Sequence, residues 1–240
     1  MKTKEKIIGD SLDLFNENTF ELSTTNLLAK RSNILEGSLW YHFNSKQDLV
    51  SVHSDLFLES FDKQKIYTEK KNAIEVIQGF FSVYEVLWDY RYLFRDSFEQ
   101  FSESNPYLLG KIDRINTSVD EWVNESIVHS RKLGILTIEE IDVKNIVEIS
   151  LIIGRYWLDF SRKKYPSESN INLRKKGINL LIRSLYPYLS NESKEIMDSI
   201  SDIINAYQME TDNYHLDEMK QISTRIDNTY KMCTCKEDKK

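Results

Sequence analysis

The sequence contains little of what builds a disulfide-stapled domain or a β-rich protein. Of its 240 residues, only two are cysteine, three are proline and seven are glycine. Two cysteines cannot form a disulfide framework, and so few turn-forming residues do not suit a fold of many short strands. No stretch of about 18 uninterrupted apolar residues is present, and the polar N-terminus lacks the apolar core of a signal peptide. We therefore expect an almost wholly α-helical protein that stays in the cytoplasm.

The sequence also lacks the motifs of common enzyme classes. It contains no glycine-rich phosphate loop, no GxSxG nucleophile elbow and no HExxH pair. Its histidines are scattered singly along the chain, and such isolated histidines are more often surface or capping residues than metal ligands. The four histidines are His42, His53, His129 and His215. We expect no catalytic activity, no metal and no cofactor.

The overall charge excludes one class of nucleic-acid-binding protein. The net charge is −6 and the pI is about 5.4, so the chain is not a wholly basic coat protein, although a small DNA-reading module remains compatible with it. Both cysteines, Cys233 and Cys235, lie in the terminal "KMCTCKEDKK". They are interpreted either as a metal or redox pair, which would need further ligands nearby, or as part of a loose tail.

What the sequence does contain is apolar residues at helical spacing. The first fifty residues hold four short helix starts, the fourth at Ser45, where Asp48 three positions later completes a capping pattern. Beyond Asn72 we expect long helices over 72–103, 106–133, 139–164, 171–189 and 191–209. Residues 143–160 are apolar nearly all round, which is typical of a helix at the centre of a bundle. We expect a helix-turn-helix domain over 1–48, a helical ligand-binding and dimerisation domain over 49–209, and a weakly helical or frayed extension over 210–240.

The most informative stretch is "TTNLLAKRSNILEGSLWYHFNSKQDLV", residues 24–50. Two short helices separated by a tight turn indicate a helix-turn-helix, whose second helix enters the major groove of DNA. Gly37 lets the backbone of that helix approach DNA, and Ser38, Tyr41 and His42 can hydrogen-bond to phosphate or base atoms. Lys46 adds positive charge at the start of the next helix.

This stretch resembles the tetracycline-repressor (TetR/AcrR) family of bacterial transcriptional regulators. The family pattern is a Thr-capped helix, a tight turn, a Gly-containing recognition helix that ends in aromatic-aromatic-His-Phe, and a Ser-Lys restart. Weaker similarity through "YRYLFRDSFEQFSESNPYLLGKI" and "GILTIEEIDVKNIVEISLIIGRYWLDF" extends the resemblance to about residues 4–200. The resemblance places Thr24, Thr25, Ser38, Trp40, Tyr41, His42 and Lys46 at or near double-stranded DNA. One departure is Leu35, which stands where the family usually has a capping serine.

The charges of residues 1–50 complete the expected interface. Six basic and seven acidic residues give this segment a net charge of −1, so binding cannot rest on bulk attraction. The basic side chains would have to lie on one face. Lys2, Lys4 and Lys6 would form an arm, and Lys30, Arg31 and Lys46 would lie near phosphates. Glu36 either accepts a hydrogen bond from a cytosine amino group or repels other sequences.

A single helix-turn-helix touches too little DNA for high specificity, so we expect a homodimer on a palindromic operator. The resemblance implies that the last two long helices form the interface, and packing within one chain is the alternative. The expected interface residues are Ile178, Leu181, Leu185, Ile196, Ile200 and Ile203.

An aromatic stripe along residues 80–101 contains Arg91 and Arg95. These arginines either pair with buried carboxylates or bind an anionic, partly apolar effector. In the second interpretation the effector site contains Tyr84, Trp88, Arg91, Arg95, Phe98, Trp122, Tyr156 and Trp157. Effector binding would shift the helix expected over 45–64, change the spacing of the two DNA-binding heads and release the operator.

Together these expectations describe a ligand-responsive repressor with no membrane partner. The alternative is a helical protein of similar fold that has lost DNA binding and serves as a partner-binding module. The acidic balance of residues 1–50 and the absence of a side-chain cap at Leu35 favour that alternative.

Overall fold

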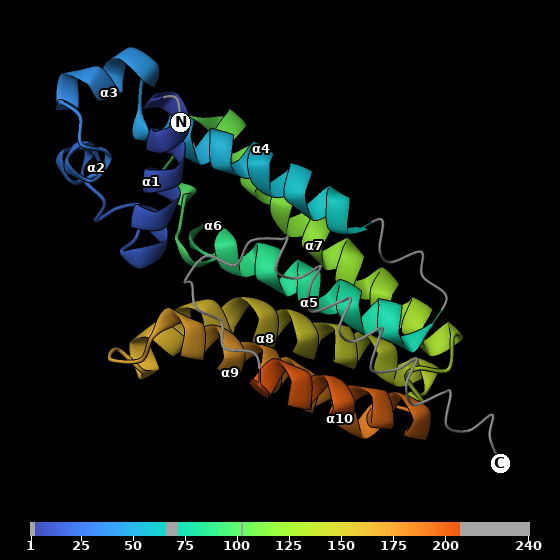
Figure 1. Cartoon of the computed structure of the whole chain (residues 1–240). Helices are drawn as coiled ribbons and strands as arrows, with labels where there is room; N and C mark the ends of the chain where they lie inside the picture. The colour runs from blue at the N-terminus through green and yellow to red at the C-terminus, as the bar shows by residue number, and fades with distance from the viewer. Residues whose placement is uncertain (1–2, 66–71, 102, 207–240) are drawn as a thin grey trace. The chain divides into compact units, whose positions relative to one another are not determined.

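The computed structural model describes residues 3–65, 72–101 and 103–206 (Figure 1). The described part of the chain is helical, with one isolated β-bridge between Leu136 and Leu189, which confirms the expected all-α class. The α-helices are α1 (Thr3–Glu17), α2 (Thr25–Ser32), α3 (Glu36–His42), α4 (Lys46–Lys65), α5 (Ala73–Asp89), α6 (Tyr92–Arg95), α7 (Pro106–Lys132), α8 (Val143–Lys164), α9 (Asn170–Leu185) and α10 (Asn191–Ala206). Short 3₁₀ turns are η2 (Glu99–Phe101), η3 (Glu140–Asp142) and η4 (Tyr186–Tyr188). Among these residues no helix has the length and apolarity needed to cross a membrane.

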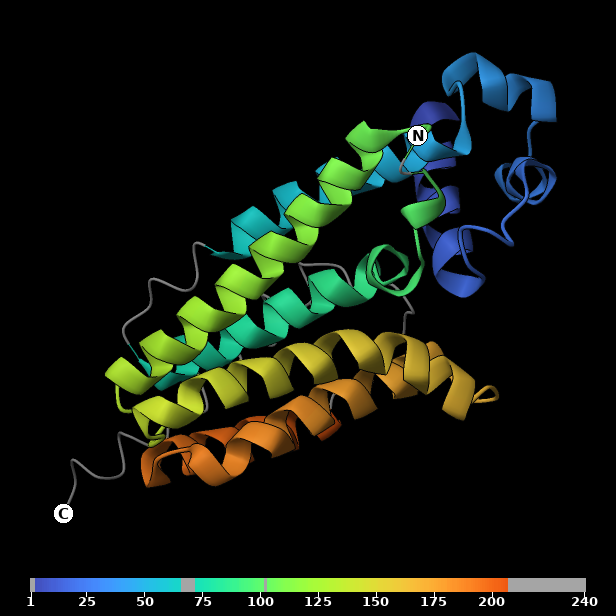
Figure 2. The same cartoon turned by 180° about the vertical axis from the view of Figure 1, so that it is seen from behind.

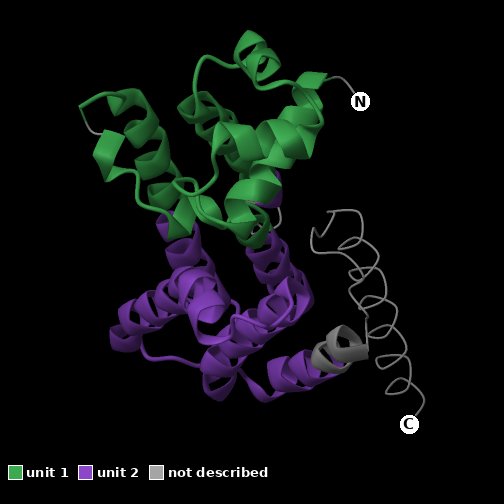
Figure 3. Ribbon diagram, turned by 90° about the vertical axis from the view of Figure 1, so that its left-hand side faces the viewer, with its two compact units in different colours: residues 1–62, 86–119 green, residues 63–85, 120–240 purple. Residues whose placement is uncertain are grey.

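The chain divides into two compact units (Figure 3). The first contains residues 1–62 and 86–119, and the second contains 63–85 and the residues from 120 onward. Helices α5 and α7 each begin in one unit and end in the other. The extension over 210–240, with Cys233 and Cys235, lies outside the described residues.

Local sequence signals set the boundaries of the first helices. The Thr24 side chain caps α2 by accepting a hydrogen bond from the backbone N–H of Leu27, and Asn33 ends this helix in the left-handed conformation with φ 55°. Ser45 and Asp48 form the expected capping pattern before α4, because the Ser45 hydroxyl accepts from the Asp48 backbone N–H and donates to its carboxylate.

The helix expected over 72–103 is interrupted after Asp89. The side-chain amide of Asn16 donates to the Asp89 carbonyl at 2.6 Å and accepts from the backbone N–H of Tyr92 at 3.1 Å. These two bonds satisfy backbone groups where the helix stops, so that α5, α6 and η2 replace one long helix.

The second unit contains α8 and α9 side by side (Figures 1 and 2). A Cβ on Gly177 of α9 would come within 2.0 Å of the Tyr84 hydroxyl and 2.4 Å of the Trp157 ring, so only glycine allows this close approach. Trp157 and Leu158 are buried on one face of α8. The expectation that α8 is buried all round is wrong, because an apolar stripe on it is exposed. That stripe consists of Ile149, Ile152, Tyr156 and Phe160.

Candidate nucleic-acid interface

Helix α3 exposes large side chains on one side and buries others on the opposite side. Leu39 and Phe43 are 1% and 5% exposed and pack into the core of the first unit. Tyr41 is 86% exposed and Trp40 is 43% exposed, so Tyr41 extends into solvent and Trp40 is only partly covered. An exposed tyrosine with a hydroxyl is able to reach a phosphate oxygen.

The sequence around Gly37 is not explained by packing within the chain. A Cβ at this position would meet no atom within 4 Å, and the residue does not have a positive φ. Neither the space inside the protein nor the backbone conformation therefore requires glycine here. A surface that approaches another molecule closely does favour glycine, as the recognition helix of a DNA-binding domain does.

Two threonines hold the start of the helix-turn-helix in place. Thr24 caps α2, and Thr25 donates a hydrogen bond from its hydroxyl to the Glu36 carboxylate at the start of α3. Glu36 and Ser38 are exposed, and His42 is partly exposed. The structure thus brings the expected residues of α2 and α3 onto neighbouring surfaces.

Several basic residues expected near phosphates are engaged within the chain instead. The Lys46 ammonium donates to the carbonyls of Phe20 and Ser23 at 2.7 and 2.8 Å, and partial burial lowers its pKa. These hydrogen bonds link α4 to the turn after α1. They differ from the expected phosphate contact, because the ammonium donates to two carbonyls of its own chain. Arg31 forms a bidentate pair with Glu17 at 2.6 and 2.8 Å.

The N-terminal lysines that the structure describes also contact groups of their own chain. Lys6 donates to the Ser32 carbonyl at 2.8 Å, and Lys4 lies over the ring of Phe43. Lys30 is exposed and has no ion-pair partner within the residues that the structure describes. It is therefore the expected basic residue best placed to bind a phosphate; Lys2 lies outside the described residues.

A buried polar network fixes α1 against α4 and α6. His53 is fully buried, and its Nε2 donates to the Ile8 carbonyl at 3.0 Å while its Nδ1 accepts from the Tyr92 hydroxyl at 2.8 Å. Burial lowers the pKa of His53 from 6.5 to about 4. The neutral imidazole therefore acts as a structural link that holds the first helix of the candidate DNA-binding head, defined here as residues 3–50.

Arg95 takes part in the same buried polar network. Its side chain is 2% exposed and pairs with Asp96 at 2.7 Å. Its two terminal nitrogens donate to the carbonyls of Phe15 and Asn16 at 2.6 and 2.9 Å. Of the two interpretations open for this arginine, pairing with a buried carboxylate is the one that the structure supports. Arg91 donates to the Trp88 carbonyl at 3.0 Å and lies over the Trp88 ring.

The eight residues expected to bind the effector are divided between the two units. Trp88, Arg91, Arg95 and Phe98 belong to the first unit, and Tyr84, Trp122, Tyr156 and Trp157 belong to the second. Tyr156 is 64% exposed, and Trp157 donates its indole N–H to the Leu173 carbonyl at 2.9 Å. Aromatic spacing along a helix does not reveal these separate environments.

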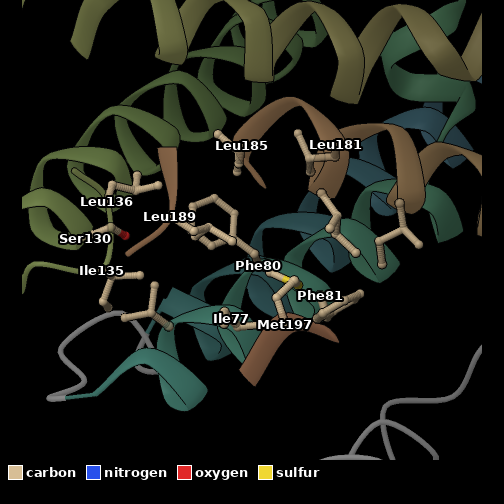
Figure 4. A pocket seen from close by; sticks show the side chains of 13 residues that line it. Ile77, Phe80, Phe81, Ser130, Ile135, Leu136, Leu181, Leu185, Leu189 and Met197 are labelled. Atoms are coloured by element: carbon tan, nitrogen blue, oxygen red, sulfur yellow. The ribbon is translucent and has the colours of Figure 1, made fainter. Parts of the chain in front are cut away.

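An apolar cavity lies elsewhere in the second unit, between α5, α7, α9, α10 and the segment around Ile135 (Figure 4). Hydrocarbon side chains form nearly all of its wall, and Ser130 supplies the single hydroxyl. The lining residues are Val76, Ile77, Phe80, Phe81, Ser130, Ile135, Leu136, Ile178, Leu181, Ile182, Leu185, Leu189 and Met197. None of the eight expected effector residues is among them.

The cavity is lined by several residues of the expected dimer interface. Ile178, Leu181 and Leu185 line the cavity, and Ile196 is 8% exposed within its own unit. These four side chains therefore contact their own unit, and whether they also form a dimer interface stays a prediction. The side chains of Ile200 and Ile203 lie outside the described residues. Exposed large apolar side chains on α8 and α9 are the four of the α8 stripe and Leu180.

Comparison with known proteins gives consistent matches along the chain. A family model described as "Bacterial regulatory proteins, tetR family" matches residues 7–52, and one described as "Bacterial transcriptional repressor" (TetR) matches residues 57–197. The negative regulator IcaR of the biofilm operon icaADBC from Staphylococcus aureus is 22% identical over 164 residues, which cover 67% of this chain and 86% of IcaR.

The solved structures agree with the family models. A TetR-family transcriptional regulator from Marinobacter aquaeolei VT8 is 25% identical, with a TM-score of 0.65 over 84% of this chain and 98% of that protein. FadR from Bacillus subtilis, solved in complex with stearoyl-CoA, has a TM-score of 0.51 at 16% identity over 75% of this chain and 97% of FadR. The second likeness shows the fold alone.

Proposed function

This chain belongs to the TetR family of bacterial transcriptional regulators, and on that premise we propose that it represses transcription in the cytoplasm as a homodimer on a palindromic operator. The observation that carries the proposal is α3, which has a solvent-facing Tyr41 and a glycine that the chain itself does not need. Both features suit a helix that enters the major groove. Thr24, Thr25, Ser38, Trp40 and His42 flank this surface and are proposed as further contacts.

The charge pattern determines what kind of DNA binding is expected. Lys30 is exposed, whereas Arg31 and Lys46 are bound to groups of their own unit. Few cations therefore remain to neutralise phosphates, so the salt dependence of binding should be shallower than that of a strongly basic repressor. Specificity must come mainly from hydrogen bonds and apolar contacts to bases.

We place the dimer interface on α8 and α9. Ile149, Ile152, Tyr156 and Phe160 follow one another at helical spacing and are 40 to 64% exposed, and Leu180 on α9 is 45% exposed. Exposed apolar side chains in such a stripe are costly in a monomer. A second copy of the same surface, related by a two-fold axis, would cover them and match the two-fold symmetry of a palindrome.

The effector is proposed to be an apolar molecule that occupies the cavity of the second unit. The wall offers hydrocarbon contacts and one hydroxyl, and the Ser130 hydroxyl already donates to the Ser126 carbonyl. No charged side chain lines the cavity, so an anionic head group would have to remain outside it. An acyl chain or a ring system matches the apolar chemistry of these walls. The relative FadR was solved with an acyl-CoA, which is compatible with this class.

Helices α5 and α7 connect the cavity to the unit that contains the DNA-binding head. Each runs from one unit into the other, and α5 lines the cavity at Ile77 and Phe81. A ligand that binds one arrangement of these helices more tightly shifts the protein toward that arrangement. The ratio of the ligand's affinities for the two arrangements sets the largest possible change in operator affinity. This adds two helices to the expectation that the helix over 45–64 shifts when the effector binds.

Binding to duplexes from the region flanking the gene tests the function. Fluorescence anisotropy should detect binding in 50 mM salt that weakens as salt rises. Tyr41→Ala and Lys30→Ala should weaken binding, whereas Tyr107→Ala, which changes an exposed tyrosine outside the head, should not. Absence of sequence-selective binding at low salt would favour the alternative of a partner-binding module.

The dimer surface and the cavity each have a matched test. Ile152→Glu should produce monomers in light scattering, whereas Ile141→Glu, at an 85% exposed isoleucine off the α8 stripe, should leave the dimer intact. Leu181→Trp should fill the cavity and abolish binding of the apolar fluorophore N-phenyl-1-naphthylamine. A dimer that survives Ile152→Glu, or unchanged fluorophore binding in Leu181→Trp, would contradict the corresponding assignment.

A further inference from the structure

The start of α3 carries an exposed leucine followed directly by an exposed glutamate. Leu35 is 80% exposed at the cap position, where it makes no side-chain hydrogen bond. A serine at such a position stabilises a helix by about 1 kcal/mol, so leucine forgoes a cap and also places a large apolar group in water. Glu36 follows it, exposed and acidic, in the part of the head that is expected to approach a polyanion.

Glu36 is held in one orientation. The Thr25 hydroxyl, on α2, donates to Oε1 of the Glu36 carboxylate across the turn. Within the described residues no ion pair neutralises this carboxylate, and its Oε2 has no hydrogen-bond partner. The side chain therefore presents a fixed acceptor on the same exposed surface as Leu35.

From this pair we infer that Leu35 and Glu36 determine operator specificity by reading adjacent bases, a thymine through its methyl group and a cytosine through its amino group. The inference rests on the proposed DNA binding and adds which bases the head selects. Leucine has no polar atom and can gain only from an apolar contact, and the C5-methyl of thymine is the apolar group of the major groove.

The choice of cytosine follows from the donor and acceptor pattern of the bases. Guanine presents two acceptors in the major groove, and thymine presents an acceptor oxygen, so each repels a carboxylate. Adenine presents a donor beside the N7 acceptor, which suits an amide that can donate as well as accept. Cytosine presents only its N4 amino donor, which matches a carboxylate that can only accept.

Adjacent positions in the chain suit adjacent base pairs. Consecutive Cα atoms are about 3.8 Å apart, close to the 3.4 Å rise of one base pair along a DNA strand. The following residue, Gly37, has no side chain to keep this part of the backbone away from the groove. The Leu35–Glu36 pair therefore can engage two neighbouring bases from one approach of the helix.

The test begins with selection of bound duplexes from a random DNA pool by the full-length protein. The selected half-site should contain a thymine next to a cytosine. Replacing that thymine by uracil removes only the methyl group and should weaken wild-type binding about fourfold per half-site. The same replacement should have no effect on Leu35→Ala, whereas the matched exposed variant Leu133→Ala should respond like the wild type.

Glu36 is tested by a change of base preference. Glu36→Gln should lose about tenfold discrimination for cytosine over adenine at the same position, because glutamine also donates to adenine N7. Thr25→Val should weaken this discrimination without changing the thymine-to-uracil effect, since the Thr25 hydroxyl orients Glu36 whereas Leu35 contacts the methyl group. Glu121→Gln, an exposed glutamate on α7, is the matched control.

The outcomes separate this inference from the proposed function. If no duplex is enriched, DNA binding itself fails. If duplexes are enriched but Leu35→Ala still responds to uracil and Glu36→Gln selects the same bases as the wild type, DNA binding stands and the assignment of these two residues is overturned.

Discussion

Replacing His53 by glutamine should flatten the dependence of stability on pH. In the folded chain the Nδ1 atom of His53 accepts from the Tyr92 hydroxyl, and a proton on that atom would convert the acceptor into a donor. Burial also disfavours the charged ring, so that the pKa falls from 6.5 to about 4. The folded state therefore favours the neutral imidazole more strongly than the unfolded state does.

The sign and size of the effect follow from linkage. Between pH 6.5 and 4 the unfolded chain binds a proton at this histidine and the folded chain does not, so stability falls as pH falls through this window. A pKa drop from 6.5 to about 4 corresponds to about 3 kcal/mol, most of which is lost between pH 7.5 and 4.5. His53→Gln retains a donor for the Ile8 carbonyl but cannot titrate, so it should lose stability at pH 7.5 and lack this part of the slope.

Urea unfolding at several pH values, at one protein concentration, measures this slope. The partly exposed His42 in the same unit offers a matched control, and His42→Gln should keep the wild-type slope. Equal slopes in the wild type and His53→Gln would show that the buried histidine does not couple folding to protonation, and would refute the reasoning.

Three further substitutions probe the packing that supports the site. Gly177→Ala should destabilise the second unit by about 1 to 3 kcal/mol in urea titrations, since its Cβ would overlap neighbouring rings; an unchanged midpoint would contradict the close packing. Glu85→Ala should cost about 3 to 5 kcal/mol by leaving Arg174 without the carboxylate it meets at 3.1 Å, and a neutral result would argue against a buried pair. Arg95→Met should lower the thermal midpoint by leaving Asp96 buried without its cation, while binding of the apolar fluorophore stays; loss of that binding in a stable variant would restore the effector role.

Local signals in the sequence predicted the helix-turn-helix well. The pattern of Ser45 with Asp48 involves residues only three positions apart, and it is confirmed. The cap at Thr24 and the left-handed Asn33 likewise depend on residues a few positions apart. The family resemblance agrees with the matching family models. Which side chains of this head contact DNA remains a prediction.

Long-range partners were not predictable in the same way. The spacing of Lys46 does not show that two carbonyls of the preceding turn bind its ammonium, and the stripe that contains Arg95 does not show Asn16 and Phe15 beside it. Each arrangement depends on residues that are far apart in the sequence and meet only in the folded chain.

Apolar periodicity also leaves open what covers a helix face. The apolar spacing of α9 at Ile178 and Leu185 is typical of a subunit interface, yet these residues line a cavity in their own unit. The residues Ile152 and Tyr156 of α8 read like a buried centre, yet they are exposed. Since burial in a core and burial in a dimer use the same side chains, the pattern alone cannot distinguish them.

The number of chains on one operator duplex tests the central claim most directly. Sedimentation equilibrium of the protein with a selected duplex should give two chains per duplex for the wild type, and Ile152→Glu should lose this complex together with the free dimer. A complex of one chain per duplex with undiminished affinity would contradict the account of a two-fold repressor.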